Sequence, residues 1–381
     1  MKERITVLYV SIYAFILSIG VLGNAHANSG EYVLHKDTRV NGDTVSILEK
    51  YISIDNVCAW PNLTQLDNGS VIATIFNQPS HGRGEGDVET WVSKDGRFWD
   101  KQGTPTNHEP GTNRMNVAAG LSASGDLIVL TSGWELKKDR KGKVSLVKVL
   151  RPWVSRSSDH GSTWKTNKNG FPTADKNMTN FIPFGDILQG EDGSLRAIGY
   201  AQSQNKVINK TAMFRSDDDG STWKKMSMIS DGSDQTSKGH NETALFYLGQ
   251  GEWIAAARRW KGGQSMDLFR STDDGESWVK ESQLTNSRQH PGHLLRLEDG
   301  RLLLTYGNRV KDQYGVAVKI SEDHGRTWGD EMMLFSQKMS VDIGYPSSVQ
   351  QEDGTIITAY YASREKNHDR YHMGTVIWEL K

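Results

Sequence analysis

The stretch Ser216-Asp-Asp-Asp-Gly-Ser-Thr-Trp223 decides the fold, because close variants of it recur along the chain. The common form is Ser-x-Asp-x-Gly-x-Thr-Trp, and successive copies begin about 50 to 65 residues apart. A unit that recurs at this spacing indicates a propeller or another repeat array. The other copies are Ser157–Trp164, Ser271–Trp278, Ser321–Trp328 and a degenerate one, Ser93–Trp99.

The residue types of this repeat are those of a turn between two strands. The aspartate can accept hydrogen bonds from backbone N–H groups of its own turn, and the glycine allows the backbone to bend. The tryptophan is large enough to fill the space between neighbouring sheets. We therefore expect the repeat aspartates to be structural, namely Asp159, Asp218, Asp273 and Asp323.

A second repeat runs in step with the first and predicts the number of units. Asp-Gly or a close variant stands six times between two apolar runs, which is a strong signal for a tight hairpin. Six hairpins predict an all-β fold, a six-bladed β-propeller whose blades are four-stranded antiparallel sheets. The turns are Leu66–Gly69, Ser122–Gly125, Glu191–Gly193, Leu248–Gly251, Leu297–Gly300 and Gln351–Gly354.

Residues 1–27 have the features of a secretory signal peptide. A basic start precedes the apolar run Ile5–Leu22, and Ala25-His-Ala27 is a small-x-small cleavage site. We therefore expect residues 28–381 to form a single propeller domain that is periplasmic or secreted. The alternative interpretation of the apolar run is an uncleaved membrane anchor.

Charge and cysteine content narrow the class of protein. The formal net charge is −1, and no basic run indicates nucleic acid or an anionic membrane as the main partner. A single cysteine, Cys58, cannot form an internal disulfide, so packing must hold an exported fold together. We predict no cofactor, and the sequence predicts no particular oligomeric state.

Three segments lie outside the regular repeat. Polar and apolar residues alternate from Glu31 to Ile54, and Thr375–Glu379 reads as a last strand. Propellers often close when one terminus completes the blade that the other began, and these two segments fit that arrangement. The basic stretch Lys137–Lys148 is expected to be a long solvated hairpin rather than a binding patch. Helices are expected to be few.

Residues at the starts of inner strands and at the ends of second strands are expected to meet at one mouth of the ring. The converging set is rich in arginine, carboxylates and aromatic rings, which suits a polar ligand that carries charge, as sugar acids do. The set includes Trp60, Asn62, Arg114, Asp186, Glu242, Arg258, His290, His293, Arg309 and Asp342–Tyr345.

The repeats, the hairpins and the motifs of the last three blades resemble the sialidase superfamily, also described as BNR-repeat proteins. The resemblance covers nearly the whole mature chain. It implies a nucleophilic tyrosine at Tyr345, in Gly344-Tyr-Pro-Ser-Ser348, with Glu242 to take its proton. It also implies that Arg258 and Arg309 hold a substrate carboxylate.

The resemblance further implies an acid/base carboxyl in the loop after the second strand of blade one. This loop is His81-Gly-Arg-Gly-Glu-Gly-Asp87, in which Asp87 is the first candidate and Glu85 the second. The implied activity is an exo-acting, retaining glycoside hydrolase that releases a terminal acidic sugar, either sialic acid or a related ulosonic or uronic acid. The expected partner is therefore a glycan.

The implied residue types fit an acidic sugar. A neutral phenol can approach an anomeric carbon that bears a carboxylate without the repulsion that a carboxylate nucleophile would meet, and tyrosine is the known exception among retaining nucleophiles. Arginine holds a carboxylate through paired, charge-assisted hydrogen bonds. The acid/base carboxyl needs partial burial and a raised pKa to protonate the leaving oxygen.

One departure from the family pattern bears on the substrate. Where sialidases have an Arg-Ile-Pro motif, this chain has Trp60-Pro61-Asn62, so the first of three clamping arginines is missing. Losing one such arginine costs about 2–5 kcal/mol. Either Arg114 or Arg83 compensates, or the substrate is a uronic acid, another ulosonic acid or a neutral sugar stacked on Trp60. A lyase and a non-catalytic glycan-binding propeller are the rival hypotheses.

Strand alternation separates the roles of neighbouring residues. Arg258 is expected to face the funnel and Arg259 to form an outward ion pair. His290 and His293 are three residues apart, so they face opposite sides of an extended strand and no metal site is predicted. One or both are expected to reach a sugar, with His290 as the first candidate.

Overall fold

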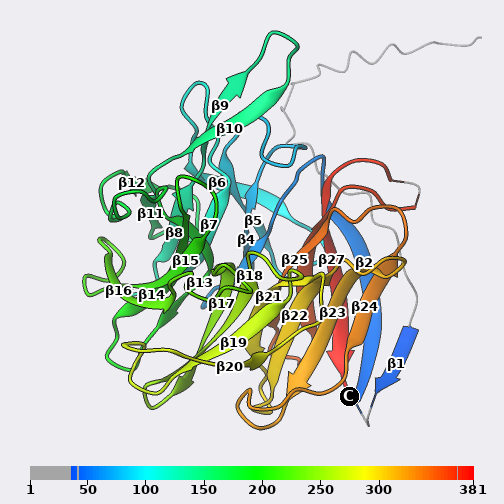
Figure 1. Cartoon of the computed structure of the whole chain (residues 1–381). Helices are drawn as coiled ribbons and strands as arrows, with labels where there is room; N and C mark the ends of the chain where they lie inside the picture. Colours follow the sequence, from blue (N-terminus) through cyan, green and yellow to red (C-terminus); the bar gives the residue numbers. More distant parts are fainter. Residues whose placement is uncertain (1–35, 41–42, 367) are drawn as a thin grey trace, which may run out of the picture.

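The computed structural model describes residues 36–40, 43–366 and 368–381, which form strands and connecting loops (Figure 1). The predicted signal peptide lies outside these residues. No helix in the described ranges has the length and apolar character needed to cross a membrane. The strands group into six four-stranded antiparallel units, of which two are joined into one larger sheet by a short parallel pairing of β7 with β13.

The units follow one another along the chain. The first contains β3 (Asn62–Gln65), β4 (Val71–Phe76), β5 (Val88–Ser93) and β6 (Asp100–Thr106). The second contains β7 (Asn116–Leu121), β8 (Leu127–Ser132), β11 (Trp153–Ser157) and β12 (Lys165–Asn167). The third contains β13 (Ile182–Gln189), β14 (Leu195–Gln202), β15 (Asn209–Ser216) and β16 (Lys224–Ser230).

The remaining units complete the series. The fourth contains β17 (His240–Gly249), β18 (Glu252–Arg259), β19 (Met266–Ser271) and β20 (Val279–Gln283). The fifth contains β21 (Gln289–Arg296), β22 (Leu302–Asn308), β23 (Tyr314–Ser321) and β24 (Met332–Gln337). The sixth contains β25 (Ile343–Gln350), β26 (Ile356–Ala362), β27 (His372–Leu380) and β2 (Asp43–Asp55), with β1 (Lys36–Val40) outside β2.

The first strands of successive units contact one another in order. β3 contacts β7, which pairs with β13, and the series continues through β17, β21 and β25. β25 in turn contacts β3, so the order of contacts returns to its starting strand without an open end.

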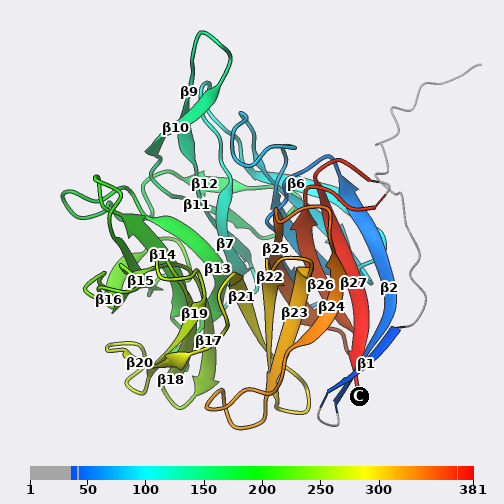
Figure 2. The same cartoon turned by 45° about the vertical axis from the view of Figure 1, so that its right-hand side comes forward.

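The sixth unit is assembled from both ends of the described chain. β2 pairs antiparallel with β27, and in both views the blue strand lies beside the red one (Figures 1 and 2). This confirms that the alternating segment before Ile54 and the last strand belong to one sheet. It also explains why only five Asp repeats occur, because the third and fourth strands of this unit are not joined by a turn.

The predicted turns are confirmed. Each of the six hairpins joins the first strand of a unit to its second. Each Asp repeat instead joins the third strand to the fourth. In Ser157–Trp164, Asp159 accepts the N–H of Thr163 at 2.8 Å and its hydroxyl at 2.6 Å. The Trp164 ring packs against a cluster that includes Ile72 of the neighbouring unit.

The hydrogen bonds of this turn lower the pKa of the Asp159 carboxyl. Hydrogen bonds from Thr163 and Ser157 lower the pKa of Asp159 from 3.8 to about 2. The carboxylate therefore stabilises the fold above the unfolded-state pKa, and this contribution is lost as pH falls toward 2. We expect Asp159→Asn to flatten the dependence of the free energy of unfolding on pH between about 4 and 2. The effect is small because the side chain is exposed. Urea titrations at several pH values measure this slope, and an unchanged slope would contradict the assignment.

A two-stranded hairpin departs from the units. β9 (Trp134–Lys138) and β10 (Val144–Val149) pair antiparallel and project away from the sheets (Figures 1 and 2). The basic insertion is therefore a hairpin, as predicted. Trp134 and Leu146 near its base line the pocket described next.

Candidate active site

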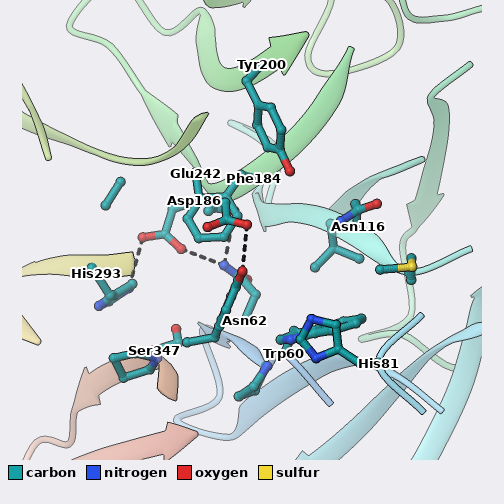
Figure 3. Close-up of a pocket in the computed structure, with 18 of the residues that line it drawn as sticks. Trp60, Asn62, His81, Asn116, Phe184, Asp186, Tyr200, Glu242, His293 and Ser347 are labelled. Carbon is teal, nitrogen blue, oxygen red and sulfur yellow. Dashed lines mark hydrogen bonds and ion pairs between the residues drawn. The ribbon is translucent and has the colours of Figure 1, made fainter. Parts of the chain in front are cut away.

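A pocket opens near the starts of the first strands (Figure 3). Its volume is about 200 Å³, and it opens to solvent. All six first strands contribute to its wall, as the predicted convergence requires. The contributing side chains are Asn62 (β3), Asn116 (β7), Asp186 (β13), Glu242 (β17), His293 (β21) and Tyr345 (β25).

Three residues singled out by the sequence are in mutual contact. Tyr345 Oη donates a hydrogen bond to Glu242 Oε1 at 2.6 Å. Arg258 forms an ion pair with the other carboxylate oxygen of Glu242, and its Nη1 lies 3.4 Å from Tyr345 Oη. The neighbouring Arg259 pairs instead with the buried Asp267, which confirms that alternation separates the two arginines.

Irregular strand pairing sets the direction in which three acidic and phenolic side chains of the pocket point. The register of β17 against β18 shifts at Glu242, that of β25 against β26 shifts at Tyr345, and that of β13 against β14 shifts at Asp186. A bulge bends a strand and re-aims its side chain. The three side chains therefore face one cavity although they come from three units.

The backbone at Tyr345 is strained. Its φ is 49°, in the left-handed region that non-glycine residues rarely adopt. The preceding Gly344 has φ 118°, and a Cβ placed there would come within 2.9 Å of the Gly307 Cα. Such a conformation costs about 1–3 kcal/mol and persists where the surrounding structure imposes it, often at functional sites.

Tyr345 has a strongly perturbed acidity. Burial raises its pKa well above the usual value, and the charge of Glu242 raises it further, while Arg258 and Arg309 act in the opposite direction. The phenol is therefore protonated at neutral pH. Glu242 Oε1 is the group in position to accept this proton when the phenolic oxygen forms a bond.

Arg309 contacts both Tyr345 and His290, and neither Arg309 nor His290 lines the pocket. The Arg309 guanidinium carbon lies 5.5 Å from the centre of the Tyr345 ring, and its Nε donates to Ile343 O at 3.0 Å. Its Nη1 donates to His290 Nδ1 at 3.2 Å. Burial, followed by the charges of Arg258 and Arg309, lowers the pKa of His290, so this imidazole is neutral.

The structure does not bring Arg114 or Arg83 to the pocket wall. Arg114 is 2% exposed, and its guanidinium lies 3.6 Å from the Trp153 ring centre. Burial lowers the pKa of Arg114 to about 10. Arg83 donates to Val144 O in the projecting hairpin at 3.1 Å. Neither side chain lines the pocket, so neither is placed to hold a substrate carboxylate there. Sequence order predicted where these residues lie along their strands and loops but not the direction of their side chains.

The predicted acid/base carboxyl is also held away from the pocket wall. Asp87 accepts the backbone N–H of His108 at 2.7 Å and pairs with its ring Nδ1 at 2.6 Å. Glu85 lies 3.5 Å from the other ring nitrogen of His108. From this loop it is His81 that lines the pocket.

His81 belongs to an acid–imidazole pair that no sequence motif singled out. Its Nδ1 lies 3.2 Å from Asp342 Oδ1, and its ring meets Trp60 edge-on at 5.0 Å. Burial alone would raise the pKa of Asp342, but hydrogen bonds from His81, Tyr361 and Tyr371 hold it below the usual range. The family pattern pointed to the carboxylates of this loop, whereas the side chain that reaches the pocket wall from it is the imidazole of His81.

Trp60 and Asn62 line the pocket as predicted. Trp60 stacks on Phe76 with ring centres 5.8 Å apart, and its Nε1 is buried without a hydrogen-bond partner in the described structure. Asn62 Nδ2 donates to Asp186 Oδ1 at 2.8 Å and to Gly185 O at 3.1 Å. These contacts join the first and third units across the pocket.

Asp186 also pairs with His293. The distance from His293 Nε2 to Asp186 Oδ2 is 3.0 Å (Figure 3). Ser348 N donates to His293 Nδ1 at 3.3 Å, so Nε2 carries the ring proton and donates to Asp186. The order of strands predicted both residues at the mouth, but it did not indicate that they pair.

Comparisons with known proteins agree with this fold. A family model described as BNR repeat-like domain matches residues 27–357. No curated protein matches the chain. A Dyadobacter fermentans protein of unknown function has 23% identity and a TM-score of 0.74, covering 88% of this chain and 99% of that one.

Two similar solved structures are sialidases. A Hadza microbial sialidase has 15% identity and a TM-score of 0.65, covering 89% of this chain and 70% of that one. Trypanosoma rangeli sialidase has 16% identity and a TM-score of 0.60, covering 92% of this chain and 58% of that one. At these identities the likeness shows the fold. The family match establishes that the chain belongs to the BNR repeat-like domain family, and these solved structures show that its fold is sialidase-like.

Proposed function

We propose that this protein is an exo-acting glycoside hydrolase of sialidase type that removes a terminal sugar with retention of configuration. The observation that carries the proposal is the hydrogen bond of 2.6 Å between Tyr345 Oη and Glu242 Oε1 at the wall of a pocket. A nucleophile in contact with its base, and a base in contact with an orienting third group, is the signature of covalent catalysis. Arg258 is that third group.

The proposed reaction has two steps. Tyr345 Oη attacks the anomeric carbon while Glu242 takes the phenolic proton, and the bond to the leaving oxygen breaks as His81, in its protonated form, protonates that oxygen. Water then attacks the anomeric carbon, His81 accepts its proton, and Glu242 returns a proton to the departing Tyr345 oxygen. The free sugar has the configuration that it had in the glycoside.

The fold and location belong to the same proposal. We infer that the six units are the blades of a six-bladed β-propeller, because the contacts among their first strands return to β3. The pocket would then lie at one mouth of the central funnel. We also propose that residues 1–27 direct export, so that the substrate is a glycan in the periplasm or outside the cell.

A product screen tests this function. The purified protein is incubated with aryl glycosides and natural oligosaccharides that end in different sugars, and released sugars are identified by mass spectrometry. We expect one free terminal sugar, whose initial anomeric form, followed by NMR, matches that of the substrate. A product with a new double bond and ultraviolet absorbance would instead indicate a lyase, and sugar binding without any product would indicate a non-catalytic propeller.

The choice of His81 over Asp87 as proton donor makes a separate prediction. We expect His81→Gln to reduce kcat/KM by about 10²–10³-fold for alkyl glycosides, whose leaving groups need a proton. The loss should be much smaller for dinitrophenyl glycosides, which leave without one. Asp87→Asn is the matched control, because Asp87 belongs to the same loop. If Asp87→Asn lowers kcat/KM selectively for alkyl glycosides and His81→Gln does not, Asp87 is the proton donor instead.

A further inference from the structure

The pocket wall carries an excess of hydrogen-bond acceptors. Each oxygen of Asp186 accepts one protein donor, Asn62 on one side and His293 on the other, which leaves further lone pairs on both. The Oδ1 atoms of Asn62 and Asn116 are buried and have no partner in the described structure. Because those two amide oxygens expose almost no surface, the acceptors left for a ligand are the two oxygens of Asp186, whose side chain is 17% exposed.

The basic groups among the described lining residues are two imidazoles, those of His81 and His293, and each already faces a carboxylate, that of Asp342 and that of Asp186. Among the described residues that line the pocket, Asp186 and Glu242 are acidic and none is arginine or lysine. The positive charge nearest to the nucleophile, Arg258, is already paired with Glu242. Arg309 donates to Ile343 O and His290. A carboxylate on the ligand would have no hydrogen to donate to Asp186 and would meet its charge.

The rest of the wall is aromatic. Trp60, Phe184, Tyr200 and Tyr345 all line the pocket, and the rings of Phe184 and Tyr345 meet edge-on at 6.1 Å. Aromatic faces beside a polar cluster suit the alternating C–H and O–H surfaces of a sugar ring.

We infer that the terminal sugar bound here is an uncharged one with a pair of adjacent hydroxyls, which Asp186 binds through its two oxygens. This inference rests on the proposed function for the chemistry but concerns only the sugar class. It also offers a different reason why the proposed nucleophile, Tyr345, is a phenol rather than a carboxylate. A carboxylate nucleophile would add a third negative charge to a cavity that already contains Asp186 and Glu242.

Binding to a catalytically silent variant tests the sugar class apart from turnover. Tyr345→Phe is titrated calorimetrically with neutral hexoses, deoxyhexoses and pentoses, and with N-acetylneuraminic and glucuronic acids. We expect at least one neutral sugar to bind at least tenfold more tightly than either acid. The inference is overturned if an acidic sugar binds more tightly, or if no neutral sugar binds.

A substitution that removes the charge of Asp186 supplies the second test. In the Tyr345→Phe background, Asp186→Asn should weaken the neutral sugar about tenfold or more, because a charged acceptor is lost. The same change should strengthen binding of the acids, because it removes their repulsion. Glu276→Gln, which removes one exposed charge outside the pocket wall, is the matched control and should change neither. Equal effects of Asp186→Asn on both classes would contradict the inference.

Turnover separates this inference from the proposed function. If the wild type releases a neutral sugar and Tyr345→Phe does not, the result supports both the proposed function and the inferred sugar class. Release of an acidic sugar, also lost in Tyr345→Phe, keeps the proposed function and overturns the sugar class. Absence of turnover with tight neutral-sugar binding overturns the proposed function and supports the sugar class.

Discussion

Tyr345→Phe is expected to reduce kcat on the best glycoside found by about 10⁴-fold or more, because residues that act as a nucleophilic unit contribute effects of this size. The substitution removes only Oη, which donates to Glu242. The ring keeps its contacts with Trp60 and Tyr361. The melting temperature should therefore change by only a few degrees, so that lost activity cannot be attributed to unfolding.

Tyr200→Phe is the matched control for this variant. Tyr200 lines the same pocket, and burial raises its pKa strongly, as it does for Tyr345. Both substitutions remove a phenolic oxygen from this cavity. The oxygen of Tyr345 donates to the proposed base Glu242, and that of Tyr200 serves as the comparison. We expect less than a tenfold loss. Comparable losses in the two variants would contradict the assignment of Tyr345 as nucleophile.

Gly374→Ala is expected to destabilise the fold strongly, although it adds only one methyl group. Gly374 lies opposite Tyr360 in the pairing of β27 with β26, and a Cβ at this position would overlap the ring and hydroxyl of Tyr360. Tyr360 is fully buried, and its Oη donates to Glu365 Oε1 at 2.8 Å. Glu365 also pairs with His372 at 3.1 Å.

The cost of this substitution combines two effects. Overpacking costs about 1–3 kcal/mol, and a buried carboxylate that loses a donor costs about 1–3 kcal/mol more. We expect the free energy of unfolding in urea to fall by about 2–6 kcal/mol. Gly329→Ala is the control, because its nearest contact is Ile320 O at an ordinary 3.5 Å. It should change stability by less than about 0.5 kcal/mol, and an equal loss in both variants would contradict the argument.

The sequence predicted the units well because their signals are local. An Asp-Gly turn between apolar runs and a Ser-x-Asp-x-Gly-x-Thr-Trp turn each need only a few consecutive residues. The order of turns therefore predicted which strand ends face the pocket. This order put Tyr345, Glu242 and Arg258 at one mouth, and the resemblance to sialidases implied that the tyrosine and glutamate act together. Strand alternation separated Arg258 from Arg259.

The rest of the site depends on features that sequence order does not contain. Bulges at Asp186, Glu242 and Tyr345 interrupt the alternation from which side-chain direction was argued. Arg114 starts at the expected strand end but turns toward Trp153, where an aromatic face receives its guanidinium. The pairing of His81 with Asp342 joins residues 261 positions apart, and no local pattern announces it.

The pairing of β2 with β27 has a consequence for the time course of folding. A ribosome makes β2 first, yet its partner strand is among the last residues to emerge, with residues 56–371 between them. The edge of β2 that pairs with β27 must therefore wait for its partner while the first five units are synthesised, although its other edge can pair with β1.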